Sequence, residues 1–531
     1  MEKNFIVRQT FVNGNIHLKE TLTVEDLLRV SDPVVEKAVA QIDDALKMAN
    51  LDASDIQLVI LAGGSSQLPG VREKIRKKLN IEPCEIPRNL MLAVSYGAAL
   101  YHREIIMLPK SKQDKRILGH NISIFVDDGG AKKEKVLLWH NQELPAKAQH
   151  KFFVDEGMSV ATINLMMSNN RERKFLQKRN LELSGNAKEI IVDIFVDENR
   201  IISLAAYDPE HPETKAAIRC AVSTMDANSI KQAQEKLGIT ATAKRGNGGK
   251  QDCIGINLGT TTSELSYCNR TGVVELEALD NPEPVAEKEL GYAKYCFPSV
   301  VYYKDGFKNI QVANQAAVDA MGGTDTADRC FDTFKIKPRT RPLAEIDGEP
   351  VMVRDLSAKL LNKIWETAQN EFANPPSAAV ITVPAAFSPD ECQDTYNAAE
   401  IAGIETITLI DEPTAAFYYY KHVQELDLEE VQNVLVFDFG GGTCDVAILD
   451  VKENGDEAIS PYKDCIYKVL STCGDKNCGG RDVDNALLDE ICARFEEKNG
   501  CKVSPSALRR IRDKVEAAKI ELSEIYRETM I

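Results

Sequence analysis

The chain has 531 residues, of which 44% are hydrophobic and 27% charged, a composition typical of soluble globular proteins. At roughly 150 residues per domain, this length predicts about three to four domains. The 64 Lys and Arg against 81 Asp and Glu give a net charge of −17. That charge argues against nucleic acid and anionic membranes as partners, because both favour basic surfaces. No apolar run approaches the roughly 18 residues of a membrane span, and the first residues do not read as a signal peptide, so we expect a cytoplasmic protein.

The thirteen cysteines are scattered from Cys84 to Cys501 without a C-x-x-C pair, and the seven histidines form no H-E-x-x-H motif. Both observations argue against a zinc site. We expect reduced thiols packed as small hydrophobic side chains.

The first segment, residues 1–108, alternates apolar strands with helices, as in residues 56–61 followed by 71–79. Such alternation is the signature of an α/β domain. The polar stretch that follows, residues 108–115, has no periodicity and predicts a linker.

Residues 117–222 predict an all-β domain. Ile122, Ile124 and Val126 alternate with polar residues, and residues 160–165 alternate in the same way, which is the pattern of half-buried strands.

The segment 223–250 predicts one short helix and a flexible tether. The helix covers residues 226–237, with Asp226 or Asn228 as the N-cap and Gly238 as its end. The Gly- and Lys-rich residues behind it have the composition of a tether.

The last segment, residues 251–531, is again α/β, with a strand at 378–383 followed by a helix at 389–402. The sequence therefore predicts α/β material at both ends of the chain and a β domain between them.

Two glycine-rich hairpins, residues 254–267 and 434–449, share one sequence pattern. In each, a polar side chain, Asn257 or Asp438, stands two residues before a glycine at the turn between two strands. Glycines let backbone N–H groups close on phosphate oxygens, and threonine hydroxyls add donors. A carboxylate beside such a turn can hold a hydrated Mg²⁺ ion.

Either hairpin alone could be a tight turn without a ligand, but the repetition favours a phosphate site. Neither G-x-x-x-x-G-K-[ST] nor G-x-G-x-x-G occurs in the chain, so the common nucleotide-binding motifs are absent. A third glycine turn, at residues 59–66, ends a strand and precedes a helix, where its amides could meet a nucleoside or a phosphate.

These segments resemble the signature segments of Hsp70-type chaperones. The matching residues are 254–263, 438–445, 410–416, 382–385, 61–69 and 96–99, together with 142–147 and 181–185 of the β segment. The resemblance implies an actin-like ATPase domain, two-lobed and ribonuclease-H-like, and an all-β sandwich that binds peptides.

The order of the segments differs from that of the family. Residues 251–531 resemble the N-terminal part of the ATPase domain, and residues 1–108 resemble its C-terminal part. The chain could be circularly permuted into one folded domain, or each half could need a partner chain. Permutation is tolerated where surface termini lie close together, so we favour a single folded domain.

The resemblance also implies a set of roles for a site that takes ATP or ADP with Mg²⁺, and K⁺ as a further cation. The implied catalytic residues are Lys335, Glu412, Asp438, Thr443 and Asp445, with Mg²⁺ held through water by Asp438, Glu412 and Asn257. The implied nucleotide contacts are Asn257, Gly259, Thr260, Thr261, Thr262, Gly440, Gly441, Gly442, Glu516, Lys519, Ser523, Gly63, Gly64 and Ser65. A lysine, a metal ion and carboxylates suit phosphoryl transfer, which needs placement and charge neutralisation. Without the resemblance, Glu516, Lys519 and Ser523 would read as a solvated helix face.

The chain departs from the family at four places. Asn257 replaces an aspartate, Gln67 and Ile520 replace two arginines that sandwich adenine, Cys392 replaces an arginine that relays between the domains, and the linker at 110–115 lacks an apolar segment. A hydrogen bond to a charged group is worth about 1.5–3 kcal/mol, so losing one predicts hydrolysis roughly 10- to 100-fold slower. We also expect weaker nucleotide binding and altered coupling between the domains.

The resulting expectation is an Hsp70-like chaperone that hydrolyses ATP slowly and binds extended hydrophobic peptides, with J-domain and nucleotide-exchange proteins as co-chaperones. Ile122, Ile124 and Phe125 are candidates for the peptide groove, although the alternation leaves open whether each faces the groove or the interior. The helix at 226–237 would be a reduced lid that lets peptides exchange quickly. Two alternatives remain open at this point: a nucleotide-binding pseudo-ATPase scaffold, and a small-molecule kinase on the same actin-like core.

Overall fold

The computed structural model describes most of the chain. The described residues are 4–13, 16–86, 90–107, 116–128, 131–155, 157–168, 173–184, 186–219, 225–240, 253–270, 273–285, 294–321, 325–326, 328–337, 339, 341–372, 374–424, 431–453 and 465–530. The predicted linker at 110–115 and the predicted tether from 241 to 250 lie outside them. Within the described residues, no helix is both long enough and apolar enough to cross a membrane.

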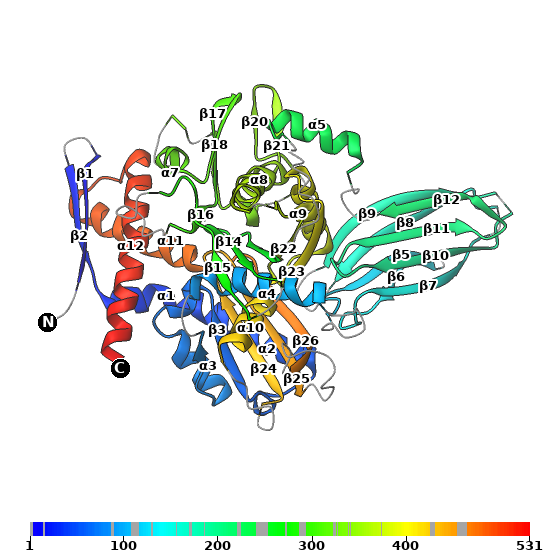
Figure 1. Ribbon diagram of the computed structural model, residues 1–531, viewed down its shortest axis with the longest axis horizontal. Coiled ribbons are helices and arrows are strands. Elements are labelled where there is room, and N and C mark those ends of the chain that lie inside the picture. Colours follow the sequence, from blue (N-terminus) through cyan, green and yellow to red (C-terminus); the bar gives the residue numbers. More distant parts are fainter. Residues whose placement is uncertain are drawn as a thin grey trace.

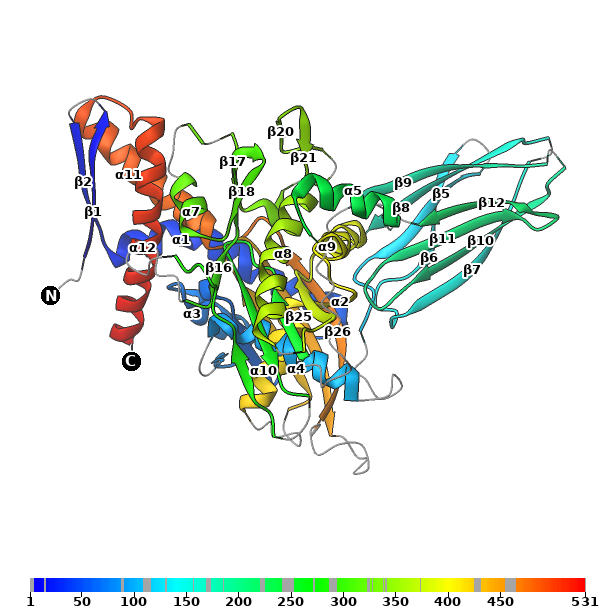
Figure 2. The same ribbon diagram turned by 45° about the horizontal axis from the view of Figure 1, so that its top comes forward.

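The molecule consists of an α/β body and an elongated β-sandwich that projects from one end of it (Figures 1 and 2). Two large mixed sheets form the centre of the body. One has the order β15–β14–β13–β22–β23, with β16 paired to β14. Its strands are β13 (Cys253–Asn257), β14 (Thr262–Cys268), β15 (Leu276–Ala278), β16 (Cys296–Pro298), β22 (Ala378–Val383) and β23 (Thr406–Asp411).

The second sheet joins the two ends of the chain. Its order is β26–β25–β24–β3–β4, with β3 (Leu58–Ala62), β4 (Cys84–Glu85), β24 (Asn433–Phe439), β25 (Cys444–Glu453) and β26 (Cys465–Asp475). β3 pairs with β24 in parallel, so that Leu61 lies opposite Phe437. A strand from the first 108 residues is therefore built into a sheet made mostly from the last hundred.

Helix α4 (Ala93–Met107) provides a second junction between the two ends. It lies between β13 and α10 (Glu412–Val423). A Cβ atom on Gly97 would overlap the Ala415 carbonyl oxygen, and one on Gly255 would overlap the backbone nitrogen of Ala99. This close approach of backbones requires glycine, so residues 1–108 and 251–531 share one packed core.

The remaining helices cover the two sheets. Around the second sheet lie α1 (Val24–Val39), α2 (Gln41–Ala49), α3 (Val71–Leu79), α11 (Gly480–Asn499) and α12 (Pro505–Met530), with the hairpin β1 (Phe5–Asn13) and β2 (Ile16–Leu22). Beside the first sheet lie α7 (Gln315–Met321), α8 (Val353–Glu371), α9 (Pro389–Ile401), β17 (Val300–Phe307), β18 (Asn309–Val312), β19 (Cys330–Asp332), β20 (Ala344–Ile346) and β21 (Glu349–Val351).

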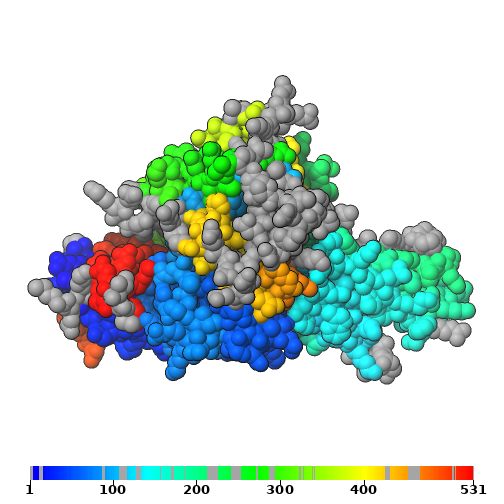
Figure 3. All heavy atoms as spheres, turned by 60° about the horizontal axis from the view of Figure 1, so that its bottom comes forward, coloured from blue at the N-terminus to red at the C-terminus, as the bar shows by residue number. Residues whose placement is uncertain are grey.

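The chain termini lie on the same side of the body, away from the sandwich (Figures 1 and 2). β1 packs along α12, where Lys514 Nζ donates to Gln9 Oε1 at 3.0 Å. The space-filling view shows the α12 surface next to that of the first residues of the chain, with the sandwich at the opposite end (Figure 3).

The sandwich consists of two four-stranded antiparallel sheets, with orders β6–β5–β8–β9 and β12–β11–β10–β7. The strands are β5 (Asn121–Asp128), β6 (Ala131–Leu138), β7 (Ala146–Phe153), β8 (Val160–Ser168), β9 (Arg173–Glu182), β10 (Glu189–Val196), β11 (Ile202–Asp208) and β12 (His211–Arg219). Ile122 and Ile124 are fully buried in the core between the sheets. Their prediction as groove residues is therefore wrong, because alternation shows which residues share a face but not which face is covered.

Helix α5 (Ala227–Leu237) has the ends that the sequence predicts. The Ser229 N–H donates to the Asp226 carboxylate at 2.7 Å, and Gly238 ends the helix in a left-handed conformation. However, Gln234 Nε2 donates to the Ile401 carbonyl oxygen at 3.0 Å, and Leu237 is buried in the core of the body. The predicted lid over the sandwich is wrong in this structure, because the apolar face of α5 is used by the α/β body.

Candidate functional site

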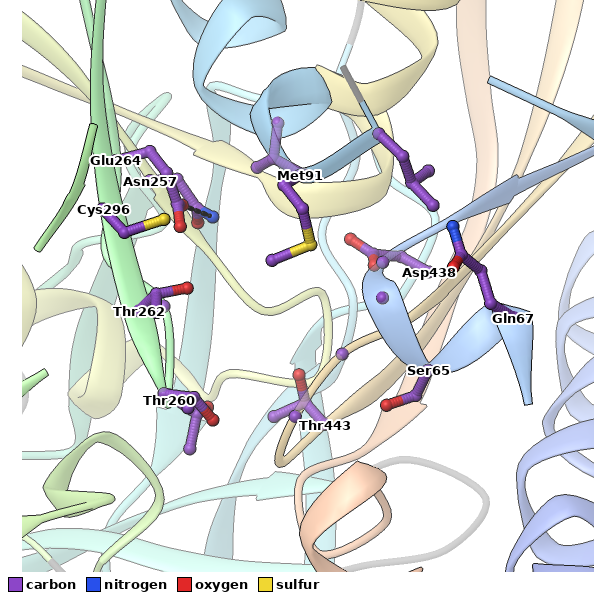
Figure 4. Close-up of a pocket in the computed structure, with 18 of the residues that line it drawn as sticks. Ser65, Gln67, Met91, Asn257, Thr260, Thr262, Glu264, Cys296, Asp438 and Thr443 are labelled. Atoms are coloured by element: carbon purple, nitrogen blue, oxygen red, sulfur yellow. Dashed lines mark hydrogen bonds between the residues drawn. The ribbon is translucent and has the colours of Figure 1, made fainter. Parts of the chain in front are cut away.

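A pocket of about 340 Å³ opens between the turns of the two glycine hairpins, a volume in the range of small-molecule sites. The hairpin β13–β14 forms one wall and β24–β25 another (Figure 4). The turn after β3, which continues into the short helix η2 (Gly64–Gln67), and one face of α12 complete the lining.

The tips of the two hairpins touch each other. A Cβ atom on Gly441 would overlap Thr261 Oγ1, and one on Gly442 would lie 2.6 Å from Thr260 Cγ2. Only glycine permits this approach, and it leaves backbone N–H groups and threonine hydroxyls around one small space. Such a cradle of donors suits phosphate oxygens.

A lysine and two carboxylates converge on this cradle. Lys335, in the short helix η5 (Phe334–Ile336), forms a buried ion pair with Glu412, the first residue of α10. Asp438, at the end of β24, lines the same cavity. Burial raises the pKa of Asp438 to about 7; the charge of Glu412 adds to this effect, while Lys335 opposes it.

Asp445 lies on β25 behind the cavity, and it is not among the lining residues. Its Oδ1 accepts a hydrogen bond from the Ala386 N–H at 3.0 Å. Its Oδ2 is buried and has no hydrogen-bond partner among the described residues. Burial and the charges of Glu412 and Asp438 raise the pKa of Asp445 well above its usual range. A buried acceptor of this kind fits a cation or an ordered water.

The opposite wall carries an amide and a carboxylate. Asn257 and Glu264 are cross-strand partners in β13 and β14, and Asn257 Nδ2 donates to Glu264 Oε2 at 2.7 Å. Figure 4 shows both side chains together on one wall, across the cavity from Asp438. Burial raises the pKa of Glu264 to about 7, although hydrogen bonds from Thr262 and Asn257 and the charge of Lys335 oppose the shift.

Glu264 is a lining residue that the sequence prediction missed. An isolated glutamate in a strand usually points to solvent, and no motif marks this one. The internal repeat could have identified it, because Glu264 follows Asn257 by the same spacing that separates Asp445 from Asp438.

The other end of the pocket is lined by the turn at Gly63–Ser65 and by Glu516, Lys519 and Ser523 of α12. Gly63 has φ 75°, and a Cβ atom there would lie 2.5 Å from Asp438 Oδ1. Lys519 Nζ contacts Asp484 Oδ1 at 2.8 Å, and Ser523 Oγ donates to the Lys519 carbonyl oxygen at 2.7 Å.

Gln67 and Ile520 line this end of the pocket. The two positions at which the resemblance places arginines thus present an amide and an apolar side chain.

The structure places every predicted site residue except Gly442 and Asp445 on the surface of this one pocket. Lining residues that the sequence did not indicate are Leu68, Leu90, Met91, Val94, Glu264, Tyr295, Cys296 and Glu524. Several of these are apolar or sulfur-containing, and their place in the pocket depends on tertiary packing rather than on a local pattern.

The carboxylates are spread around the cavity rather than gathered into one ligand set. Among the described residues, no group of three His, Cys, Asp or Glu side chains could hold a metal ion directly. Glu264, Glu412 and Asp438 all line the pocket and offer oxygen ligands. This arrangement fits Mg²⁺, which prefers oxygen and keeps several of its waters.

The sandwich contacts the body beside this pocket. Arg200, in the loop between β10 and β11, forms two short contacts with Asp411, at 2.7 Å from Nη1 to Oδ1 and 2.8 Å from Nη2 to Oδ2. The pair is almost fully buried, and Asp411 immediately precedes Glu412. The Asn199 side chain accepts a hydrogen bond from the Leu409 N–H at 2.9 Å.

Cys392, on α9, is buried close to the Arg200–Asp411 pair. Burial raises the pKa of its thiol to about 12, against the opposing charge of Arg200. Two guanidinium groups therefore act on this position, those of Arg200 and Arg116, and neither comes from α9.

A sequence model of the Hsp70 family, described as Hsp70 protein, matches residues 2–236 and 253–531. The chain belongs to the Hsp70 family. The resemblance predicted from the signature segments is confirmed at this level, and the chain is in general terms an ATP-binding chaperone. Family membership likewise supports binding of ATP, ADP and Mg²⁺, and interaction with unfolded peptides and co-chaperones.

Proposed function

We propose that this Hsp70 hydrolyses ATP slowly in the pocket between the two hairpins and uses the sandwich to bind extended peptides. The observation that carries the proposal is the Lys335–Glu412 ion pair, which lies against a glycine and threonine cradle closed by both hairpins. Lys335 neutralises phosphate charge in this arrangement, and Glu412 and Asp438 orient water. Mg²⁺, when bound, would supply further positive charge that neutralises the phosphates.

The site residues keep the roles that the resemblance implies. Thr260 and Thr261 contact phosphates from the first turn, and Thr443 reaches the γ-phosphate from the second. Glu516, Lys519 and Ser523 hold the adenosine from α12, together with the turn at Gly63–Ser65. Asp445 holds a water or a K⁺ ion from behind.

The segment order is proposed to be a circular permutation that folds as one domain. The parallel pairing of β3 with β24 and the packing of β1 along α12 support this arrangement. Both termini lie at the surface on one side of the body, which is where a permuted chain can begin and end without disturbing the core.

Peptide binding is proposed for the outer face of the β6–β5–β8–β9 sheet. Phe125 is the one predicted groove residue that lies outside the core cluster, and the Arg173 guanidinium stands 5.2 Å from its ring centre. Extended segments can add backbone contacts and insert side chains at such a face.

Arg200 is proposed to carry the effect of peptide binding to the ATP pocket. Its buried ion pair joins the sandwich to Asp411, which is bonded covalently to Glu412. Removing one partner of a buried ion pair costs about 3–5 kcal/mol, since the other charge is left unpaired. We expect Arg200→Gln to abolish peptide stimulation of ATP turnover.

The test is single-turnover ATP hydrolysis with and without an apolar peptide, on the wild type, Lys335→Ala and Arg200→Gln. The proposal expects slow hydrolysis that depends on Lys335 and rises with peptide. Tight nucleotide binding without Lys335-dependent hydrolysis would favour a pseudo-ATPase scaffold instead. Native mass measurement with ATP and Mg²⁺ tests the single domain, because a nucleotide-bound monomer is expected and an obligate dimer would contradict it.

A further inference from the structure

The wall formed by β13 and β14 holds one acidic side chain that faces the pocket. Glu264 is 1% exposed, lines the cavity and lies opposite Asn257 in the strand register. A buried glutamate needs a partner, and here it accepts from the Asn257 amide at 2.7 Å.

Asn257 has little freedom to act on a cation by itself. Its Oδ1 accepts a hydrogen bond from Thr382 Oγ1 at 2.9 Å, while its Nδ2 donates to Glu264. Turning the amide oxygen toward the cavity would break the bond to Thr382. Glu264, by contrast, has roughly four acceptor sites as a carboxylate, so the bond from Asn257 leaves it able to accept from further donors.

Glu264 also lies within electrostatic reach of the residues that define the phosphate end of the pocket. Lys335 and Glu412 both act on its charge. With Glu412 and Asp438, it brings carboxylates to the cavity from three different elements: β14, α10 and β24.

We propose that Glu264 is a positioning residue that supplies, from β14, the negative charge that the family carries at position 257. It acts on Mg²⁺ through the water shell of the ion, in the pocket of the proposed ATPase, and the inference therefore rests on that function. The charge has moved from one strand of the hairpin to the directly opposite residue of the other strand.

The alternative is a purely structural role, in which Glu264 only accepts the hydrogen bond from the Asn257 amide. Glu264→Gln separates the two, because a glutamine oxygen can still accept from Asn257 while the negative charge is lost. The measurement is ADP affinity by calorimetry with saturating Mg²⁺ and with EDTA, so that the ratio reports Mg²⁺ binding without hydrolysis. We expect the ratio to fall roughly tenfold or more in Glu264→Gln, the size of one charged hydrogen bond.

The double variant Asn257→Asp with Glu264→Gln returns the charge to the first strand and should restore most of the ratio. It also provides the readout if Glu264→Gln alone fails to fold. Asn257→Asp alone should lower the melting temperature, because two buried carboxylates would then face each other. Glu277→Gln, which removes an exposed carboxylate from β15 on the same sheet, is the matched control and should leave the ratio unchanged.

A wild-type ratio in Glu264→Gln would overturn the inference, and so would a double variant that does not regain it. If the wild-type chain binds ADP equally with Mg²⁺ and with EDTA, or not at all, the proposed function fails and takes this inference with it. The two failures are distinguishable. Failure of the proposed function appears in the wild-type chain, whereas failure of this inference appears only in the variants.

Discussion

The two glycine hairpins place a polar pair at the same register but fill it differently. In the β24–β25 hairpin, Asp438 lies opposite Asp445, two acids side by side. In the β13–β14 hairpin, Asn257 lies opposite Glu264, an amide that donates to an acid. Each hairpin thus keeps at least one carboxylate, but only the second must accommodate two.

The electrostatic consequences differ accordingly. Burial raises the pKa of both Asp438 and Asp445, and the charges of Glu412 and Asp438 raise the pKa of Asp445 further. Burial raises the pKa of Glu264 as well, to about 7, but in this hairpin the hydrogen bond from the partner residue Asn257 opposes the rise. The comparison shows that the carboxylate of such a pair can lie on either strand of the hairpin. It needs a hydrogen-bond donor, as Asn257 is for Glu264, or a nearby cation, as Lys335 is for Asp438.

The turns also close in different ways. In the second hairpin the Gly440 N–H donates to the Thr443 carbonyl oxygen at 2.9 Å, an ordinary backbone turn. In the first hairpin the Gly259 N–H donates to Ser263 Oγ at 3.1 Å, and Ser299 Oγ donates to the Gly259 carbonyl oxygen at 2.8 Å. The first turn therefore depends on side chains where the second depends on backbone.

The largest expected effect comes from making the second pair like the first. Asp438→Asn places an amide opposite Asp445, as Asn257 stands opposite Glu264. We expect ATP hydrolysis to fall roughly 10- to 100-fold, since a charged acceptor beside Lys335 and Glu412 is lost. Single-turnover kinetics measure the loss.

The melting temperature of Asp438→Asn should not fall, because a buried carboxylate with a raised pKa is removed. This melting measurement is the control for folding. A hydrolysis rate within a factor of two of the wild-type rate would show that the charge of Asp438 is not needed for hydrolysis.

The two hairpins of this site could be predicted from the sequence because their pattern is local, whereas Lys335, Glu412 and the α12 residues were indicated only by the resemblance to the family. A run of apolar residues, a polar residue, a glycine turn and a second run specify a hairpin without any tertiary information, and β13–β14 and β24–β25 have this pattern. The Asp226 cap and Gly238 likewise fix the ends of α5.

The features that could not be predicted depend on tertiary packing, that is, on which element covers each helix or strand face. Local signals specify α5 as a helix but not that Leu237 is buried in the α/β body. Alternation in β5 places Ile122 and Ile124 on one face, yet only the second sheet makes that face the core. The burial of Glu264 has the same origin, since it comes from the sheet and the pocket around it, although the repeat between the hairpins marks its position in the sequence.

A second prediction uses the glycines that occupy the same place in the two turns. A Cβ atom on Gly259 would overlap the Thr262 carbonyl oxygen, whereas one on Gly440 would lie 3.6 Å from the Thr443 carbonyl oxygen, an ordinary contact. Gly259→Ala should destabilise the chain by about 1–3 kcal/mol because backbone must move, and Gly440→Ala should change stability by less than about 0.5 kcal/mol. Urea unfolding of both variants checks this, and equal losses would contradict the difference in turn geometry.

A third prediction concerns the pH dependence of the first hairpin. His102, on α4, accepts a hydrogen bond at Nδ1 from the Ile254 N–H of β13 at 2.9 Å, and burial lowers its pKa to about 4. The unfolded chain has the ordinary pKa of about 6.5 and binds more protons between these values, so stability falls as the pH drops from 6.5 to 4. The loss should reach about 2 kcal/mol at pH 5.

The measurement is the difference in unfolding free energy between pH 7 and pH 5 for the wild type and His102→Gln. The variant removes this titration, so its pH dependence should be weaker by the same amount. Parallel curves would show that the junction of α4 with β13 is not held by a neutral histidine.

The smallest expected effect is on the hydroxyl that closes the first turn. Ser299 is buried, and its hydroxyl contacts Ser263 Oγ at 3.0 Å as well as the Gly259 carbonyl oxygen. Ser299→Ala should cost about 1 kcal/mol of stability, because a buried acceptor loses its donor. It should also weaken ADP binding several-fold, because the Gly259 turn, which is proposed to contact the phosphates, is less firmly held. Ser357→Ala, which removes an equally buried serine hydroxyl from α8, corrects for the loss of the hydroxyl itself and should leave ADP affinity unchanged. If both variants bind ADP equally well, the side-chain closure of the first turn stabilises the fold without shaping the phosphate site, and the two hairpins differ in construction but not in function.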